Sequence, residues 1–186
     1  MSRKILVRIL VGAVIFQLLV LAGKYLLSVY PLWTGKPVIL EIVPVDPRSL
    51  FRGNYVHLDY SIARLDDKVI PDELRLYNGS MAYVHLKEDR GVYRPSTVTA
   101  TAPAEGIFIR GRVKRFQKND NGAGMSLTFG IEAYFAPKKR ALEIEHTFRD
   151  RRQEDTMAYA QIRIAGNGKA ALEDILWELP DAGQLK

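Results

Sequence analysis

Residues 43–60 read VPVDPRSLFRGNYVHLDY and join a restricted turn to a strand. Pro44 and Pro47 fix φ and cannot donate a hydrogen bond to a sheet, and Asp46 can hydrogen-bond back into the turn that Pro47 opens. Gly53 then permits a positive φ or a close approach of another backbone segment. The first half of this stretch therefore predicts a sharp bend in the chain.

The second half of the stretch alternates with the period of a β-strand, which we predict over residues 54–63. One face carries Val56, Leu58 and Tyr60, and the other carries Tyr55, His57 and Asp59. We expect the apolar face to be buried. Tyr55 and Tyr60 are predicted to be packing anchors whose hydroxyl groups reach a backbone acceptor. Arg48 and Arg52 are expected to pair with Asp46 or Asp59 and to fix the loop.

Through Gly53, Tyr55, Leu58 and Tyr60, this stretch resembles the GDYXXLXY family of bacterial membrane-anchored proteins. The departure is Asn54, where the family has Asp. If the family's Asp carboxylate binds a cation or acts as a base, Asn54 cannot do either in the same way. An acceptor in a turn would be kept, because the Asn side-chain carbonyl also accepts hydrogen bonds. We favour the structural role.

The resemblance extends beyond the motif itself. The residues before it resemble the family's lead-in, namely Pro44, Asp46-Pro47-Arg48, Leu50, Phe51 and Arg52. Residues 130–137, GIEAYFAP, also look like the family, so the likeness covers most of the chain after its N-terminal segment. It implies a structural or interaction motif made of Asp46, Arg48, Arg52, Gly53, Asn54, Tyr55, Leu58 and Tyr60, with no catalytic residue.

The positive charge of the chain is concentrated at its start. The chain has 27 basic and 21 acidic side chains, and residues 1–36 hold five basic ones and no acid. The rest of the chain is nearly neutral, which argues against a domain that binds nucleic acid. With no cysteine there is no disulfide, no thiolate metal site and no cysteine nucleophile.

An apolar run follows the first basic residues and predicts a single transmembrane helix from about Leu10 to Tyr30. Arg3, Lys4 and Arg8 would stay in the cytoplasm, which places the C-terminal part in the periplasm. A cleaved signal peptide is the alternative, because Val20-Leu21-Ala22 has the small-residue spacing of a cleavage site. We favour a retained anchor in the bacterial cytoplasmic (inner) membrane.

We expect two parts, a membrane anchor over residues 1–33 and an extracytoplasmic β-rich domain over residues 34–186, joined at a hinge over 34–36. Short alternating segments separated by turns predict an antiparallel β-sandwich or partly open β-barrel. The predicted strands lie at 38–43, 54–63, 81–87, 91–99, 106–116, 126–135, 157–164 and 170–177. A short peripheral helix is expected within 138–155, where Leu142, Ile144 and Phe148 are spaced towards a helical stripe.

Three chemical hypotheses arise from the polar residues. The three histidines, His57, His85 and His146, lack the spacing of metal ligands, so we expect neither a metal nor a cofactor. Ser49 and Lys87 would suit a serine-lysine hydrolase resembling signal peptidase, but acidic residues follow Lys87 and would keep it charged. The basic run Arg110, Arg112, Lys114, Arg115 and Lys118 predicts a solvated strand face, or a surface for anionic headgroups or an acidic partner.

The function that these observations favour is a non-enzymatic, membrane-anchored envelope protein. The family resemblance implies an accessory or scaffolding subunit of a polytopic membrane protein, with the lipid bilayer as its surroundings. A membrane-bound serine-lysine hydrolase and an envelope sensor with a ligand pocket near Tyr55 and His57 are the alternatives.

Overall fold

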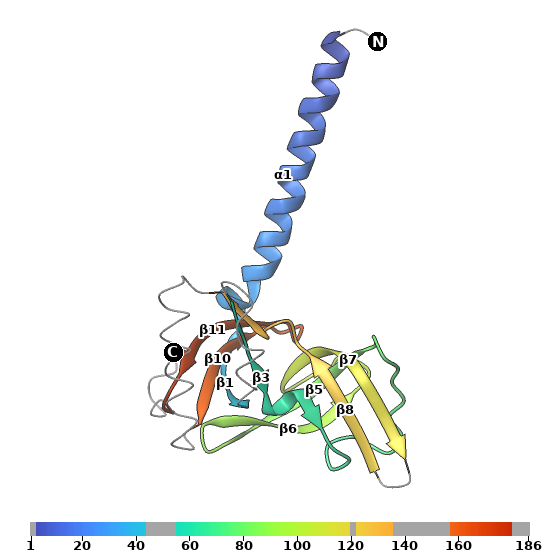
Figure 1. Ribbon diagram of the computed structural model, residues 1–186, viewed down its shortest axis with the longest axis vertical. Coiled ribbons are helices and arrows are strands. Elements are labelled where there is room, and N and C mark those ends of the chain that lie inside the picture. Colours follow the sequence, from blue (N-terminus) through green and yellow to red (C-terminus); the bar gives the residue numbers. More distant parts are fainter. Residues whose placement is uncertain (1–2, 44–54, 120–121, 136–156, 180–186) are drawn as a thin grey trace.

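The computed structural model describes residues 3–43, 55–119, 122–135 and 157–179. One long helix, α1, projects from a body of antiparallel strands that curl into a half-barrel (Figure 1). The predicted class, mainly β with one N-terminal apolar helix, is confirmed. The helix predicted within 138–155 lies outside the described residues.

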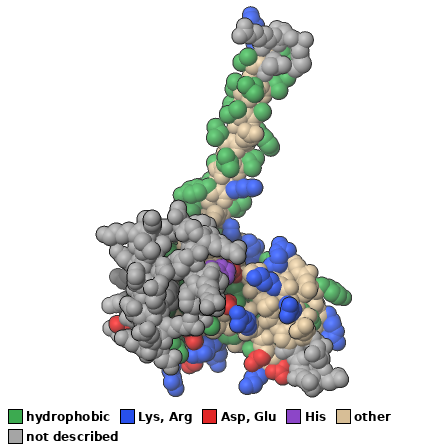
Figure 2. All heavy atoms as spheres, viewed as in Figure 1, with side chains coloured by type: hydrophobic (Ala, Val, Ile, Leu, Met, Phe, Trp, Pro, Cys, Tyr) green, Lys and Arg blue, Asp and Glu red, His purple; other side chains and the backbone are tan. Residues whose placement is uncertain are grey.

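The helix α1 (Arg3–Thr34) has 32 residues and is about 48 Å long at 1.5 Å per residue. Residues Val7–Thr34 are long and apolar enough to cross a membrane, with a mean hydropathy of 2.1, and none of the most apolar window is buried. The green side chains along the shaft in Figure 2 are therefore exposed. A signal sequence near the N-terminus meets the same criteria of length and composition, so the helix by itself fits both interpretations.

The strands of the body form two larger sheets and one separate pair. The four-stranded sheet has the order β11-β10-β1-β3, from β11 (Ala170–Leu176), β10 (Ala158–Ile164), β1 (Lys36–Val43) and β3 (Asp59–Tyr60). The five-stranded sheet has the order β4-β8-β7-β5-β6, from β4 (Arg64–Leu65), β8 (Gly122–Thr128), β7 (Ile107–Asn119), β5 (Met81–Asp89) and β6 (Val92–Thr99). The strand β2 (Tyr55–His57) pairs with β9 (Ala133–Phe135), and a short 3₁₀ helix, η1 (Ser61–Ala63), follows β3.

Two hairpins join strands that the sequence predicts, 81–87 to 91–99 and 157–164 to 170–177, and local turn chemistry explains both. Arg90 and Gly91 connect β5 to β6 with φ values of 53° and 83°, as a two-residue turn of the type favoured in hairpins requires. The β10–β11 turn uses Gly168 at a φ of 78°, and the Gly168 N–H donates to the Ala165 carbonyl at 2.8 Å.

The prediction of one strand over 54–63 is wrong for the described residues. The chain leaves β2 after His57 and enters a different sheet at Asp59, because β2 pairs with β9 whereas β3 pairs with β1. The Leu58 N–H, between the two strands, donates to the Glu132 carbonyl at 2.7 Å. The predicted burial is nevertheless confirmed, since Val56, Leu58 and Tyr60 are at most 1% exposed.

The strand predicted over 126–135 is also divided. The strand β8 ends at Thr128 and β9 begins at Ala133. Gly130 lies between them with a φ of 83°, a conformation that glycine adopts without steric cost. The chain therefore turns out of the five-stranded sheet at this glycine and continues beside the motif strand.

The hydrophobic core fills the space between the two larger sheets. It is formed by inward side chains of both, including Val38, Leu40 and Ile162 from one sheet and Val84 and Ile109 from the other, all fully buried. Burying one such side chain contributes about 1.5–3 kcal/mol. The core holds β1 in the centre of the body, and α1 enters the body directly through β1.

Candidate functional site

The motif strand contacts the second family-like segment, and we call this contact, between residues 55–60 and 129–135, the motif corner. The strands β2 and β9 pair antiparallel, with Val56 opposite Tyr134 and His57 opposite Ala133. The Leu58 N–H extends the contact to the Glu132 carbonyl. The two stretches that carry the family resemblance are therefore neighbours in the fold.

Tyr60 anchors the motif corner from inside the core. Its side chain is 1% exposed, and its hydroxyl donates to the Ile131 carbonyl at 2.7 Å. Burial raises the pKa of the Tyr60 phenol above its usual range, and the nearby Glu132 carboxylate raises it further. The phenol stays neutral and acts as a hydrogen-bond donor, as predicted. The side chain of Tyr55 lies outside the described residues.

Glu132 closes the turn between β8 and β9. Its carboxylate accepts hydrogen bonds from the backbone N–H groups of Phe129 and Gly130, the latter at 2.9 Å. Sequence reasoning missed this residue as part of the site. The only signal was its place in the family-like segment 130–137, because nothing in the sequence shows that the side chain folds back over the two preceding residues.

Asp59 pairs with Arg64, a partner that the sequence did not suggest. The Arg64 Nη2 lies 2.7 Å from Asp59 Oδ2, and Asp59 Oδ1 accepts the Tyr60 N–H at 3.2 Å. The Arg64 side chain is 76% exposed, so the pair contributes at most about 1 kcal/mol. The other motif residues, Asp46, Arg48, Arg52, Gly53 and Asn54, lie outside the described residues.

The remaining residues considered for chemistry do not converge. His57 is exposed on β2, and His85 lies on β5 in another sheet, where its Nε2 is buried without a hydrogen-bond partner among the described residues. In the part of the chain that the structure describes, no three His, Cys, Asp or Glu side chains could together hold a metal ion. Lys87 is exposed beside Glu88 and Asp89, and Ser49 and His146 lie outside the described residues.

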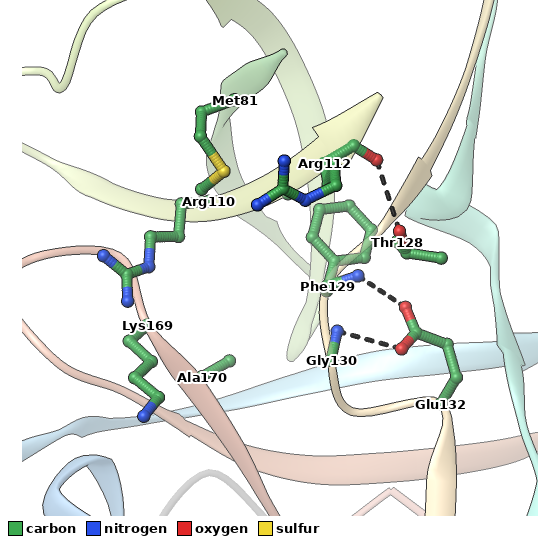
Figure 3. Close-up of a pocket in the computed structure, with 10 residues that line it drawn as sticks. Met81, Arg110, Arg112, Thr128, Phe129, Gly130, Glu132, Lys169 and Ala170 are labelled. Carbon is green, nitrogen blue, oxygen red and sulfur yellow. Dashed lines mark hydrogen bonds between the residues drawn. The ribbon is translucent and has the colours of Figure 1, made fainter. Parts of the chain in front are cut away.

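A cavity of about 350 Å³ lies beside the motif corner (Figure 3), and we call it the cationic pocket. It is lined by Met81, Arg110, Gly111, Arg112, Thr128, Phe129, Gly130, Glu132, Lys169 and Ala170. Three of these side chains are basic, and the single acidic one is Glu132. The pocket therefore shares the Phe129–Glu132 turn with the motif corner but differs from it in charge.

Two glycines allow the walls of the cationic pocket to approach one another. A Cβ atom on Gly111 would lie 2.8 Å from the Phe129 ring, so only glycine lets that ring cover β7. A Cβ atom on Gly168 would lie 2.7 Å from the Phe108 ring, and the Arg110 N–H donates to the Gly168 carbonyl at 2.9 Å. The β10–β11 turn is thus attached to β7, which brings Lys169 to the same cavity as Arg110.

The lower end of α1 is attached to the same β10–β11 hairpin. The Lys169 ammonium donates to the Leu27 carbonyl, and the Gly35 N–H donates to the Pro31 carbonyl at 2.8 Å. A Cβ atom on Gly35 would lie 2.3 Å from the Pro31 carbonyl oxygen and 2.9 Å from the Ile164 nitrogen. The helix therefore ends and the strand begins at Gly35, within the predicted hinge over residues 34–36. The close packing of Gly35 fixes the backbone there, so this segment does not have the freedom of a hinge.

The structure thus defines a class of protein in which one apolar helix is attached to a half-barrel, and a buried hydrogen-bonded motif corner lies beside a basic cavity. Comparison with family models identifies the family, since that of the GDYXXLXY protein matches residues 17–175. The chain belongs to the GDYXXLXY family, as its motif predicted. No curated protein and no solved structure matches it.

Proposed function

We propose that this protein is a non-enzymatic accessory or scaffolding subunit of a polytopic membrane protein. In this role α1 crosses the bacterial cytoplasmic membrane with its N-terminus inside, and the β-rich body lies in the periplasm. The family match supports the class of protein, and the helix and its attachment to the body support the arrangement.

The observation that carries the proposal is that the C-terminal part of α1 is attached to the body, whereas the apolar part before it is exposed. From Ile9 to Leu27 the helix rises about 28 Å, close to the roughly 30 Å of a hydrocarbon core. At Leu27 the body makes its hydrogen bond through Lys169, and at Gly35 it packs against β10. The body would therefore rest on the membrane surface in a fixed orientation, which suits a subunit that covers the outer face of a partner.

The residues at the two ends of the span support this orientation. Lys4 and Arg8 precede the apolar run, as the positive-inside rule requires for a cytoplasmic N-terminus. Tyr25, Tyr30 and Trp33 are exposed near the other end, where aromatic side chains suit the interface between lipid and water. Gly12 and Gly23 leave open space on the shaft for the close approach of another helix.

Retention of α1 is tested by the intact mass of the protein isolated from membranes. A retained anchor gives the mass of the full chain. Cleavage after Ala22 would remove residues 1–22 and would contradict the single-pass arrangement.

The accessory role is tested by affinity purification in mild detergent, followed by mass spectrometry. The wild type is compared with a variant in which residues 9–23 are replaced by a Leu/Ala sequence of equal length. This variant keeps Leu27–Gly35 and so keeps the attachment to the body. We expect a stoichiometric polytopic partner with the wild type and its loss with the variant, whereas Lys114→Gln on the body should retain it. Recovery of the wild type alone at native expression would contradict the proposal.

A further inference from the structure

We propose that the cationic pocket binds the phosphate group of an anionic phospholipid at the outer surface of the membrane. This inference goes beyond the accessory role, and it needs from that role only that α1 stays in the membrane. It rests on the charges that line the cavity, on the hydrogen-bonding groups left unused there, and on the position of the cavity relative to α1.

Among the described residues that line the pocket, the basic side chains outnumber the acidic one. Arg110 and Arg112 are two residues apart on β7 and so project from the same face of the strand, and Lys169 joins them from the β10–β11 turn. The acidic residue of the lining, Glu132, already accepts two backbone N–H groups and does not reach the basic side chains (Figure 3). An anion entering the cavity would therefore meet three positive charges.

Each basic side chain keeps donors that a phosphate could use. Arg110 is half-buried, and its guanidinium makes no hydrogen bond or ion pair within the described residues. Arg112 uses Nη1 for the Gly79 carbonyl at 2.7 Å, which leaves most of the five N–H groups of its guanidinium. Lys169 gives one of its three donors to Leu27. Arginine forks match phosphate oxygens in geometry as well as in charge.

The position of the pocket favours a lipid as the source of the phosphate. Lys169 both lines the cavity and binds the Leu27 carbonyl, so the edge of the cavity lies at the level where the hydrocarbon core would end. The phosphates of the outer leaflet lie just beyond that level, and the exposed side chains of Leu26 and Leu27 could contact the acyl chains. Basic pockets of this kind next to a spanning helix suit phospholipid headgroups.

The size and the lining of the pocket fit a lipid headgroup better than a whole lipid. Its volume of about 350 Å³ is at the small end of ligand sites. Its walls include Met81 and the Phe129 ring, which offer apolar contact to the carbon atoms of a glycerol group. Lys114 and Arg115, farther along β7, are exposed and do not line the cavity.

The test is thermal unfolding of the full chain in a non-ionic detergent with short-chain lipids. Dihexanoyl phosphatidylglycerol should raise the Tm in a saturable manner, because a ligand that binds only the folded state stabilises it. Zwitterionic dihexanoyl phosphatidylcholine should have a smaller effect. Arg110→Gln should raise the half-saturating concentration of phosphatidylglycerol by about tenfold, the effect of one lost charged contact. Arg110→Lys should restore part of the affinity.

The matched control is Lys114→Gln, which removes one positive charge from the same strand outside the pocket. It should leave the half-saturating concentration unchanged. An equal response of Arg110→Gln and the wild type would overturn the assignment to this pocket, and an equal response to the two lipids would overturn the requirement for an anion. If inorganic phosphate alone reproduced the full effect, the lipid source would be wrong. Since no partner is present in this experiment, its failure is distinct from failure of the accessory role.

Discussion

The motif corner and the cationic pocket share the turn from Phe129 to Glu132, yet they use their polar groups in opposite ways. In the motif corner the Tyr60 hydroxyl donates to the Ile131 carbonyl, and the backbone N–H groups of Leu58, Phe129 and Gly130 also donate to acceptors of the chain itself. In the pocket, the Arg110 guanidinium has no such acceptor within the described part of the chain. The described residues of the family motif therefore stabilise the body, and the groups available to a ligand lie beside them.

The largest expected effect is on the motif corner. Leu58 is 1% exposed in the core, so Leu58→Ala should lower the free energy of unfolding by about 3 kcal/mol, through lost burial and the cavity left behind. Urea unfolding of the full chain in detergent measures this change. Lys114→Gln should be nearly neutral in the same experiment. A change below about 1 kcal/mol for Leu58→Ala would show that the motif is not a stabilising element.

The next largest effect is expected at Gly35, where α1 joins the body. A substitution there should destabilise the attachment of α1 and leave the motif corner unchanged. Gly35→Ala places a Cβ against backbone atoms that cannot rotate away, so we expect a loss of about 2 kcal/mol. Hydrogen exchange should become faster in peptides covering residues 31–36 and 163–165 and stay unchanged over 56–60. Equal acceleration in all three segments would mean that the joint and the corner unfold as one unit.

A smaller effect is expected for Glu132→Gln, which should weaken the motif corner and strengthen lipid binding in the cationic pocket. Glu132→Gln keeps one acceptor oxygen but sets an NH₂ group against a backbone N–H, which should cost about 1–2 kcal/mol of stability. The same change removes the negative charge from the pocket, so phosphatidylglycerol should bind more tightly to this variant. Thermal unfolding with and without the lipid measures both. Weaker lipid binding would argue against electrostatic attraction in the pocket.

The smallest effect concerns the Tyr60 hydroxyl and depends on pH. Tyr60→Phe leaves the Ile131 carbonyl without its donor and should cost about 1 kcal/mol at pH 8. The folded state raises the Tyr60 pKa, so the stability that this phenol contributes is complete below the unfolded pKa of about 10 and falls as pH rises further. The difference between wild type and Tyr60→Phe should therefore shrink above pH 10.

Urea unfolding at pH 8, 9.5 and 11 measures this change. Tyr77→Phe is the control, because the Tyr77 side chain is 79% exposed. A difference between wild type and Tyr60→Phe that stays constant up to pH 11 would contradict the buried, neutral phenol.

Those parts of the fold that depend on local chemistry could be predicted from the sequence. Gly91 and Gly168 occupy turn positions with positive φ, and the predicted strands on either side of each turn pair antiparallel as hairpins. The apolar run of α1 was equally clear. The burial of Leu58 and Tyr60 followed from alternation alone, because the period of side chains persists even where the strand is interrupted.

The parts that depend on distant segments could not be predicted. The chain changes sheets at Leu58 because β9 and β1 offer separate edges, and nothing within 54–63 encodes that choice. Glu132 is one acidic residue among many until its turn is folded. Lys169 becomes a pocket residue only because Gly168 binds β7 and Leu27 lies within reach. Sequence reasoning recognised the basic run on β7, as a solvated face or a surface for anionic headgroups or an acidic partner, but could not show that Arg110 and Arg112 share a cavity with Lys169.

The β10–β11 turn has a mechanical consequence. At Gly168 it is attached to β7, and at Lys169 it is attached to α1. The turn therefore connects the helix to the strand that lines the basic cavity. A sliding of α1 by one helical turn, about 5.4 Å, would break the Leu27 bond or pull Lys169 away from Arg110. In the proposed membrane arrangement, a shift of α1 would therefore change the position of a charged group in the cavity.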